Sequence, residues 1–189
     1  IGGGLLGLEA AYGIKQRGMN VTVLHLMDRI MDRQLDARAS ALLKQSIEAK
    51  GIPVLTEANT EELIGQDGHV SQLRLKDGTV LEADFVVFAV GIRPNMALAQ
   101  SAGLRCNRGV MVNDTMQTFD PSIYAVGECI EHRNQTFGLV EPLWGQAFIC
   151  ASHLAEHGSL TFKASTVPTQ LKVSGCDVFS AGNFEPADD

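Results

Sequence analysis

Long apolar runs, surplus positive charge and closely spaced cysteines are all missing from this sequence. No stretch approaches the roughly 20 apolar residues that a helix needs to span a bilayer. Lysine and arginine together number 15 against 22 aspartates and glutamates, for a formal net charge of −7. Broad binding to nucleic acid or to an anionic membrane surface requires the opposite sign. We therefore expect no nucleic acid and no membrane among the partners of this chain.

The cysteines are few and scattered, with no C-x-x-C pair and no histidine pair at ligand spacing. This pattern favours reduced structural cysteines over a metal site or a disulfide framework. We expect no metal site, and a cytoplasmic location. His132 and His153 are expected at the surface or at helix ends. The four cysteines are Cys106, Cys129, Cys150 and Cys176.

The first ten residues are rich in glycine and fit the pattern G-x-G-x-x-G at Gly2, Gly4 and Gly7. In a dinucleotide-binding turn, these glycines provide the tight turn, the close approach of backbone to phosphate, and the close packing of helix on strand. The amides of Leu5 and Leu6 would then face the pyrophosphate with the helix dipole behind them. By itself the motif is a weak signal, because glycine-rich turns also close ordinary hairpins.

The elements after the glycines alternate between amphipathic helix and apolar strand. In the second helix we expect Leu42, Leu43 and Ile47 to face inward. The expected order is helix Leu5–Arg17 ended by Gly18, strand Met19–Met27, helix Asp36–Lys50 capped by Asp36 and ended by Gly51, and strand Ile52–Leu55. This order predicts half of a doubly wound α/β nucleotide fold. Apart from Ile1, the strand expected before the turn is missing, so we interpret the chain as a middle fragment whose parallel sheet lacks its central member.

The second strand should end near an acidic residue, about 20 residues after the glycines, that holds the ribose of NAD. His25 stands there instead, followed by Asp28 and Arg29. A carboxylate would favour NAD and a basic group would accommodate the 2′-phosphate of NADP. We place His25 near the adenosine ribose rather than in the core, and the choice between NADH and NADPH stays open.

A change of pattern follows residue 55. The segments Glu61–Gly65, His69–Leu75 and Thr79–Leu81 alternate and are joined by Asp-Gly pairs, the strongest short hairpin signal. They predict an antiparallel three-stranded meander inserted before a last parallel strand, Phe85–Val90. That strand runs into Gly91, at the strand end where an α/β sheet admits a ligand.

With these features in this order, the chain closely resembles the FAD-dependent pyridine nucleotide-disulfide oxidoreductase superfamily. The resemblance rests on Gly7-Leu-Glu9, the order of helices, strands and meander, Ala89-Val-Gly-Ile-Arg-Pro-Asn95, and a second flavin motif at Thr118–Glu128. It implies an α/β fold: a doubly wound Rossmann-like nucleotide-binding domain with a three-stranded antiparallel meander, followed by part of a FAD-binding domain. The implied domains are an NAD(P)H-binding domain at 1–95, the C-terminal part of a FAD-binding domain at 96–160, and the start of an interface segment at 161–189.

A narrower resemblance is to the large subunits of assimilatory NAD(P)H-dependent nitrite reductases. It rests on His25, on Tyr124-Ala-Val-Gly-Glu-Cys129 and on Leu171–Gly182. It implies a reductase module that passes a hydride from NAD(P)H to FAD and supplies electrons for the reduction of nitrite to ammonia. The alternatives are a reductase of a ferredoxin or rubredoxin, an NADH oxidase, or an isolated nucleotide-binding domain without turnover.

The resemblance also implies parts that this sequence does not contain. The first flavin motif, the iron–sulfur cysteines and the sirohaem domain are expected only in a parent protein, so the FAD site is incomplete and the isolated fragment is expected to be inactive. The expected partners are the dinucleotides and the remaining domains of that parent. A homodimer is left open.

The resemblance assigns a role to each expected cofactor-binding residue, and none is catalytic, since the cofactors carry the chemistry. Gly2, Gly4, Leu5 and Leu6 cradle pyrophosphate, and Gly7 lets the helix pack closely on the strand beside it. Glu9 accepts from the nicotinamide carboxamide, and His25 and Arg29 serve the adenosine ribose. Gly91 admits the cofactor to the backbone, and Glu128 meets the ribityl chain of the flavin. Glu128 departs from the aspartate of the family by one methylene. Two alternatives remain: Glu9 as a solvated helix residue, and Trp144, beside the flavin in the family, as a core anchor.

Overall fold

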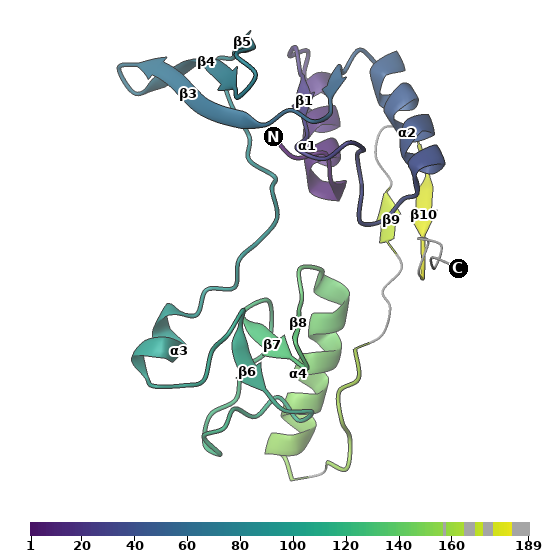
Figure 1. Ribbon diagram of the computed structural model, residues 1–189. Helices are drawn as coiled ribbons and strands as arrows, with labels where there is room; N and C mark the ends of the chain where they lie inside the picture. Colours follow the sequence, from purple (N-terminus) through teal and green to yellow (C-terminus); the bar gives the residue numbers. More distant parts are fainter. Residues whose placement is uncertain (157, 165–168, 172–175, 183–189) are drawn as a thin grey trace, which may run out of the picture. The chain divides into compact units, whose positions relative to one another are not determined.

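The computed structural model describes residues 1–156, 158–164, 169–171 and 176–182 (Figure 1). The chain divides into two compact units. The first comprises Ile1–Val90 with Pro168–Asp189, and the second comprises Gly91–Val167. Each unit has its own core, and each is described separately below.

Helix α1 begins the first unit and spans Leu5–Gln16, as the sequence predicted. Its inner face buries Leu8 and Ala11. Gly18 follows the helix with a positive φ of 83°, and its N–H donates to the Lys15 carbonyl at 2.9 Å. A glycine adopts this left-handed conformation without a Cβ clash, which is why the helix ends here.

Helix α2 spans Ala37–Ala49, and Asp36 caps it: its carboxylate accepts from the Ala39 N–H at 2.7 Å. Leu43 and Ile47 are buried as expected, but the prediction for Leu42 was wrong, since its side chain is 60% exposed. Successive helical residues point about 100° apart. The buried stripe runs through Ser40, Leu43 and Ile47, and it leaves Leu42 on the solvent side.

Strands β1 (Val23–Leu24) and β2 (Val54–Leu55) form a parallel pair. Ile1 lies on the other edge of β1, where the Gly2 N–H donates to the Leu24 carbonyl at 2.7 Å. Ile1 also bonds the segment 85–89: its amino group donates to the Val87 carbonyl at 2.7 Å, and its carbonyl accepts from the Ala89 N–H at 2.8 Å. One residue therefore stands between β1 and the segment 85–89.

Two predicted strands are shorter than expected or absent. The strand expected at 19–27 is reduced to β1, and the segment 85–90 forms no strand. A strand needs a neighbour along its length to pair its backbone groups. Between β1 and the segment 85–89 lies only the start of the glycine turn, with Ile1 bonded to Val87 and Ala89 and Gly2 bonded to Leu24. So short a neighbour cannot pair either segment along its length.

The meander is confirmed. Strands β3 (Thr60–Gln66), β4 (His69–Leu75) and β5 (Val80–Glu82) pair antiparallel in the order β3-β4-β5 (Figure 1). The β3–β4 turn places Asp67 and Gly68 at positive φ, as a tight hairpin requires. Leu73 and Leu75 of β4 are buried in a small core with Leu24 and Ala58.

Strands β9 (Thr169–Leu171) and β10 (Val178–Ser180) complete the described part of the first unit as an antiparallel pair. Both strands lie within 161–189, the range expected to begin an interface segment. Cys176 and Val178 pack against the α1–α2 core, and the Ser180 hydroxyl donates to the Gln34 carbonyl.

The second unit contains the short helix α3 (Ala97–Ser101), strands β6 (Val110–Val112), β7 (Ile130–His132) and β8 (Gln135–Thr136), and helix α4 (Val140–Leu154). β7 pairs parallel with β6 and antiparallel with β8. The core lies between these strands and α4, and consists of Met116, Ile130, Phe137, Ile149 and Phe162.

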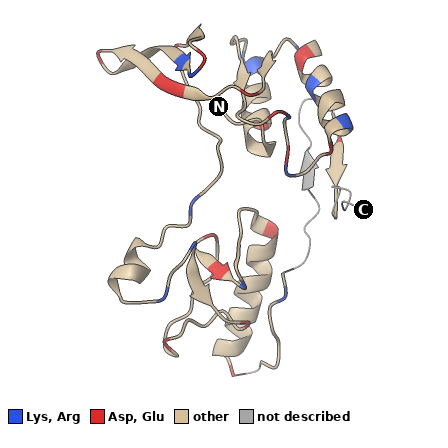
Figure 2. Ribbon diagram, viewed as in Figure 1, with Lys and Arg blue, Asp and Glu red and all other residues tan. Residues whose placement is uncertain are grey.

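Charge is mixed throughout. Figure 2 shows lysine and arginine interspersed with aspartate and glutamate along the ribbons of both units. Among the described helices, none is long and apolar enough to cross a membrane.

Candidate dinucleotide-binding site

Two glycines of the turn are required by packing. Gly2 has a φ of 111°, and a Cβ there would lie 2.3 Å from the Ala89 carbonyl oxygen. A Cβ on Gly7 would lie 1.8 Å from the Gly2 carbonyl oxygen. Both contacts are with backbone, which cannot swing aside as a side chain can. These positions therefore accept only glycine if α1 is to pack against the turn.

Gly4 differs from its neighbours, because a Cβ there would meet no atom within 4 Å. It is the N-cap of α1, with extended backbone at φ −84° and ψ −176°, and no side chain caps the helix. The first amides of a helix have no partner within the helix. Here they belong to Leu5, Leu6 and Gly7, and the Leu6 side chain beside them is 63% exposed. The start of α1 can therefore receive an anion.

His25 lies beneath the turn, with its ring engaged on both sides. The Gly3 N–H donates to His25 Nδ1 at 3.0 Å, and His25 Nε2 lies 3.2 Å from Asp32 Oδ1. The His25 residue is 9% exposed. The structure thus joins the end of β1 to the glycine turn, a link that the sequence analysis did not foresee.

The other two predicted residues of the first unit are Arg29 and Glu9. Arg29 is in the loop after β1, and its guanidinium forms an ion pair with Asp28 at 3.8 Å. Glu9 is half-buried on α1, beyond its first turn.

Gly91 and Glu128 belong to the second unit. Gly91 has a φ of 96°. Glu128 is exposed in the turn that leads into β7. Beside it, the Gly127 N–H donates at 2.8 Å to the side-chain oxygen of Gln146, which is fully buried on α4. The sequence analysis missed Gln146, since a glutamine on a helix carries no distinctive signal.

A second polar cluster lies between β6 and β7. Asp114 accepts hydrogen bonds from Arg133 Nη2 at 2.6 Å and from Arg133 Nε at 2.9 Å, and its Oδ1 lies 2.8 Å from His132 Nε2. Arg133 first, and then His132, lower the pKa of Asp114 from its usual 3.8 to about 2. The prediction of a surface or capping role for His132 was wrong: its side chain is 1% exposed. The edge of the Phe162 ring covers it at 5.2 Å between ring centroids.

Trp144 also departs from the expectation. It was expected as a core anchor, but it is 73% exposed on α4. Phe148, one turn further on, is 65% exposed. The buried positions of this helix are Gln146 and Ile149, so the sequence places its largest apolar side chains on the opposite face.

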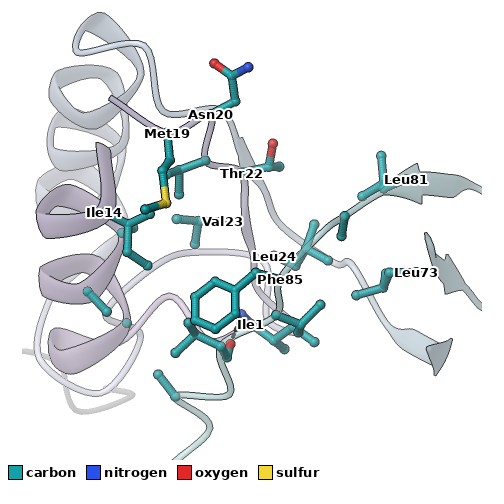
Figure 3. Close-up of a pocket in the computed structure, with 18 of the residues that line it drawn as sticks. Ile1, Ile14, Met19, Asn20, Thr22, Val23, Leu24, Leu73, Leu81 and Phe85 are labelled. Carbon is teal, nitrogen blue, oxygen red and sulfur yellow. Dashed lines mark hydrogen bonds between the residues drawn. The ribbon is translucent and has the colours of Figure 1, made fainter. Parts of the chain in front are cut away.

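Figure 3 shows a pocket of about 630 Å³ in the first unit. It starts at Ile1 and runs between α1, the segment 19–24, β4, β5 and the segment 82–89. Its labelled side chains are mainly apolar and include Ile14 of α1 and Phe85 (Figure 3). Its carboxylates are Glu82 and Asp84, which would repel a pyrophosphate. Of the predicted cofactor-binding residues, only Gly2 and Gly7 line this pocket.

Comparison with known proteins decides the family. The model of the pyridine nucleotide-disulphide oxidoreductase family matches residues 1–147. The chain belongs to this family. Both the expected superfamily and the expected α/β fold are thereby confirmed.

Two relatives from Bacillus subtilis (strain 168) support the narrower resemblance. The chain is 53% identical over 189 residues to an NAD(P)H nitrite reductase, covering 100% of this chain and 23% of the relative. It is 45% identical over 185 residues to an assimilatory nitrate reductase electron transfer subunit, covering 98% of this chain and 24% of the relative. The chain therefore spans about a quarter of the length of these family members.

A solved structure supports the fold. The NAD-dependent persulfide reductase from A. fulgidus matches with a TM-score of 0.91 at 31% identity, over 97% of this chain and 35% of that one. In the present chain, six of the predicted residues lie together at the start of α1, and one of them, His25, is joined to the others by its hydrogen bond with Gly3. Those residues are Gly2, Gly4, Leu5, Leu6, Gly7 and His25.

Proposed function

We propose that this chain is the NAD(P)H-binding part, with a portion of the FAD-binding part, of a reductase that supplies electrons for the reduction of nitrite to ammonia. The identity of 53% with an NAD(P)H nitrite reductase over the whole chain supports this function. In this scheme the bound NAD(P)H supplies a hydride to FAD. The chain's own residues bind and orient these cofactors, and none of them is assigned a catalytic proton transfer.

The glycine turn fits the pyrophosphate of a dinucleotide. Gly4 leaves open space in front of the uncapped start of α1, where the amides of Leu5, Leu6 and Gly7 carry the positive end of the helix dipole. Two phosphate charges in front of these amides would satisfy donors that have no partner within the helix.

The remaining assignments are part of the same proposal. Glu9 accepts from the nicotinamide carboxamide, and His25 and Arg29 serve the adenosine end. In the second unit, Gly91 allows the backbone to approach a cofactor, and Glu128 accepts from a ribityl hydroxyl. Glu128 is exposed and so is accessible to such a contact.

The observation that carries the proposal is the difference among the glycines. Packing explains Gly2 and Gly7, whose added Cβ atoms would collide with backbone at 2.3 Å and 1.8 Å. Packing does not explain Gly4, which has nothing within 4 Å. A glycine that the fold does not need, at the uncapped start of a helix, is what a close-approaching phosphate requires.

The experiment is the substitution Gly4→Val in the 189-residue chain, with Gly13→Val as the matched control. Gly13 lies on the same helix, and a Cβ there also meets nothing within 4 Å. Both variants should fold with a wild-type circular dichroism spectrum. Calorimetric titration should show NADH or NADPH binding weakened at least about tenfold in Gly4→Val and unchanged in Gly13→Val. Equal affinity in both variants would contradict the proposal.

One observation favours a second, narrower function for the isolated chain. Because it spans about a quarter of its relatives, it can act as a dinucleotide-binding domain without turnover. A visible spectrum separates the two functions: a stoichiometric flavin band at roughly 450 nm in the purified chain would refute the narrower one.

The parent protein, its location and its assembly are also part of this proposal. The parent reductase would supply the rest of the FAD site, the iron–sulfur cluster and the sirohaem. We place it in the cytoplasm, with a homodimer as one assembly to test by light scattering. Nucleotide preference is tested by titrating NADH and NADPH against the wild type and His25→Asp, which should shift the ratio of the two affinities.

A further inference from the structure

The loop after β1 holds the glycine turn from both sides. Gly3 is buried; its N–H donates to His25 Nδ1 at 3.0 Å, and its carbonyl accepts from the Met31 N–H at 2.9 Å. Ile30 and Met31 are themselves buried in the core of the unit. A Cβ on Gly3 would lie 2.8 Å from Ile30 Cγ2 and 2.9 Å from His25 Cγ. Gly3 thus has little freedom to move independently of this loop.

These contacts determine which nitrogen of His25 carries the proton. Because Nδ1 accepts from the Gly3 N–H, it must be unprotonated. The proton of the neutral ring then lies on Nε2, which donates to Asp32 Oδ1 at 3.2 Å. Protonation of Nδ1 would set two donors against each other at 3.0 Å and remove the acceptor from Gly3.

We propose that His25 is a positioning residue of the dinucleotide site: its Nδ1 fixes the Gly3 N–H, and with it the turn proposed to bind phosphate. The proposal rests on the function proposed above for Gly4 and the start of α1. His25 acts through Gly3, and its buried ring has both nitrogens engaged within the protein. This role adds to the place near the adenosine ribose proposed above and does not replace it.

Asp32 holds the ring from the other side. Its carboxylate, 25% exposed, accepts from His25 Nε2–H at 3.2 Å, and this bond leaves Nδ1 facing the Gly3 N–H.

The test uses the 189-residue chain and four proteins: the wild type, His25→Asn, His25→Leu and the control His69→Asn, which changes an exposed histidine on β4. Asparagine can offer its oxygen to Gly3, whereas leucine offers no acceptor. NADH affinity should be unchanged in His69→Asn and close to the wild-type value in His25→Asn. In His25→Leu it should be about tenfold weaker, as expected for the loss of a buried backbone hydrogen bond. Wild-type affinity in His25→Leu would overturn the proposal.

A second readout needs no nucleotide and no variant. Nitrogen-15 spectra of the His25 ring should show the proton on Nε2, with a coupling across the hydrogen bond from the Gly3 amide to Nδ1. A proton on Nδ1, or no coupling to the Gly3 amide, would overturn the proposal. If the chain bound no dinucleotide, the proposed function would fail, while these spectra would still decide whether His25 holds Gly3.

Discussion

Four apolar residues added before Ile1 should form a strand that fills the pocket of the first unit. The pocket of about 630 Å³ runs from Ile1 between β1 and the segment 85–89, with α1 on one side and Leu73 and Leu81 on the other. At about 3.3 Å per residue, four residues placed before Ile1 would extend about 13 Å along this line. Their backbone would meet the edges that now bond Gly2, at Leu24, and Ile1, at Val87.

The expected gain can be worked out per residue. Burial of a valine or isoleucine side chain contributes about 2 kcal/mol, and a backbone hydrogen bond adds about 1 kcal/mol. Ordering a residue costs about 1.5 kcal/mol. Four residues of the type Val-Ile-Val-Val should therefore raise the free energy of unfolding by about 6 kcal/mol, an upper value because unfolded chains already bury some apolar surface. The extension also replaces the half-buried ammonium of Ile1, whose pKa burial lowers, with a neutral amide.

The assay is guanidinium unfolding followed by circular dichroism, with a Ser-Gly-Ser-Gly extension of equal length as the control. The apolar extension should raise both the midpoint and the slope, since more surface is buried, and hydrogen exchange should slow at Leu24 and Val87. Equal stability of the two extensions would refute the reasoning, as would stabilisation without protection of those amides.

Three further predictions concern single positions. Gly7→Ala should destabilise the first unit by about 1–3 kcal/mol in chemical unfolding, because the added Cβ would lie 1.8 Å from a backbone oxygen. This cost should exceed the gain from the better helix propensity of alanine. An unchanged unfolding midpoint would contradict this packing. Asp36→Ala should cost about 1 kcal/mol through loss of the α2 cap, measured in the same way, whereas Asp36→Ser should retain most of the stability. Carboxyl carbon NMR should find the pKa of Asp114 at about 2. The hydrogen-bonded pair of Asp114 and Arg133 therefore stabilises the fold fully above the usual carboxyl pKa, and this stabilisation is lost as pH falls through about 2. Arg133→Gln should raise that pKa, and a value that does not move would show that Arg133 is not the main cause.

Local signals in the sequence were sufficient for much of the fold. Asp36 and Gly18 mark helix ends because capping and left-handed backbone are properties of single residues. The Asp-Gly pairs located the meander for the same reason. The glycine spacing located the dinucleotide turn. Leu42 was misplaced because adjacent leucines leave the direction of the buried face ambiguous by one residue.

Other features depended on neighbours that are distant in the chain. The segment 85–90 reads as a buried strand, but pairing needs a partner along its edge, and Ile1 alone supplies one. His132 reads as an isolated histidine, and only the fold brings Asp114 and Phe162 to it. Trp144 reads as a core residue, but the buried face of α4 is defined by Gln146 and Ile149.

The sequence by itself determined the family, the order of the elements and the position of the glycine turn, because these depend on local spacing and residue type. Only the tertiary structure showed which glycines of that turn are required by packing. Gly2 is required by the backbone of Ala89 and Gly7 by the carbonyl of Gly2, whereas a Cβ on Gly4 would meet nothing within 4 Å. The hydrogen bond from Gly3 to His25 likewise joins residues 22 positions apart, and no pattern in the sequence predicts that these two residues are in contact.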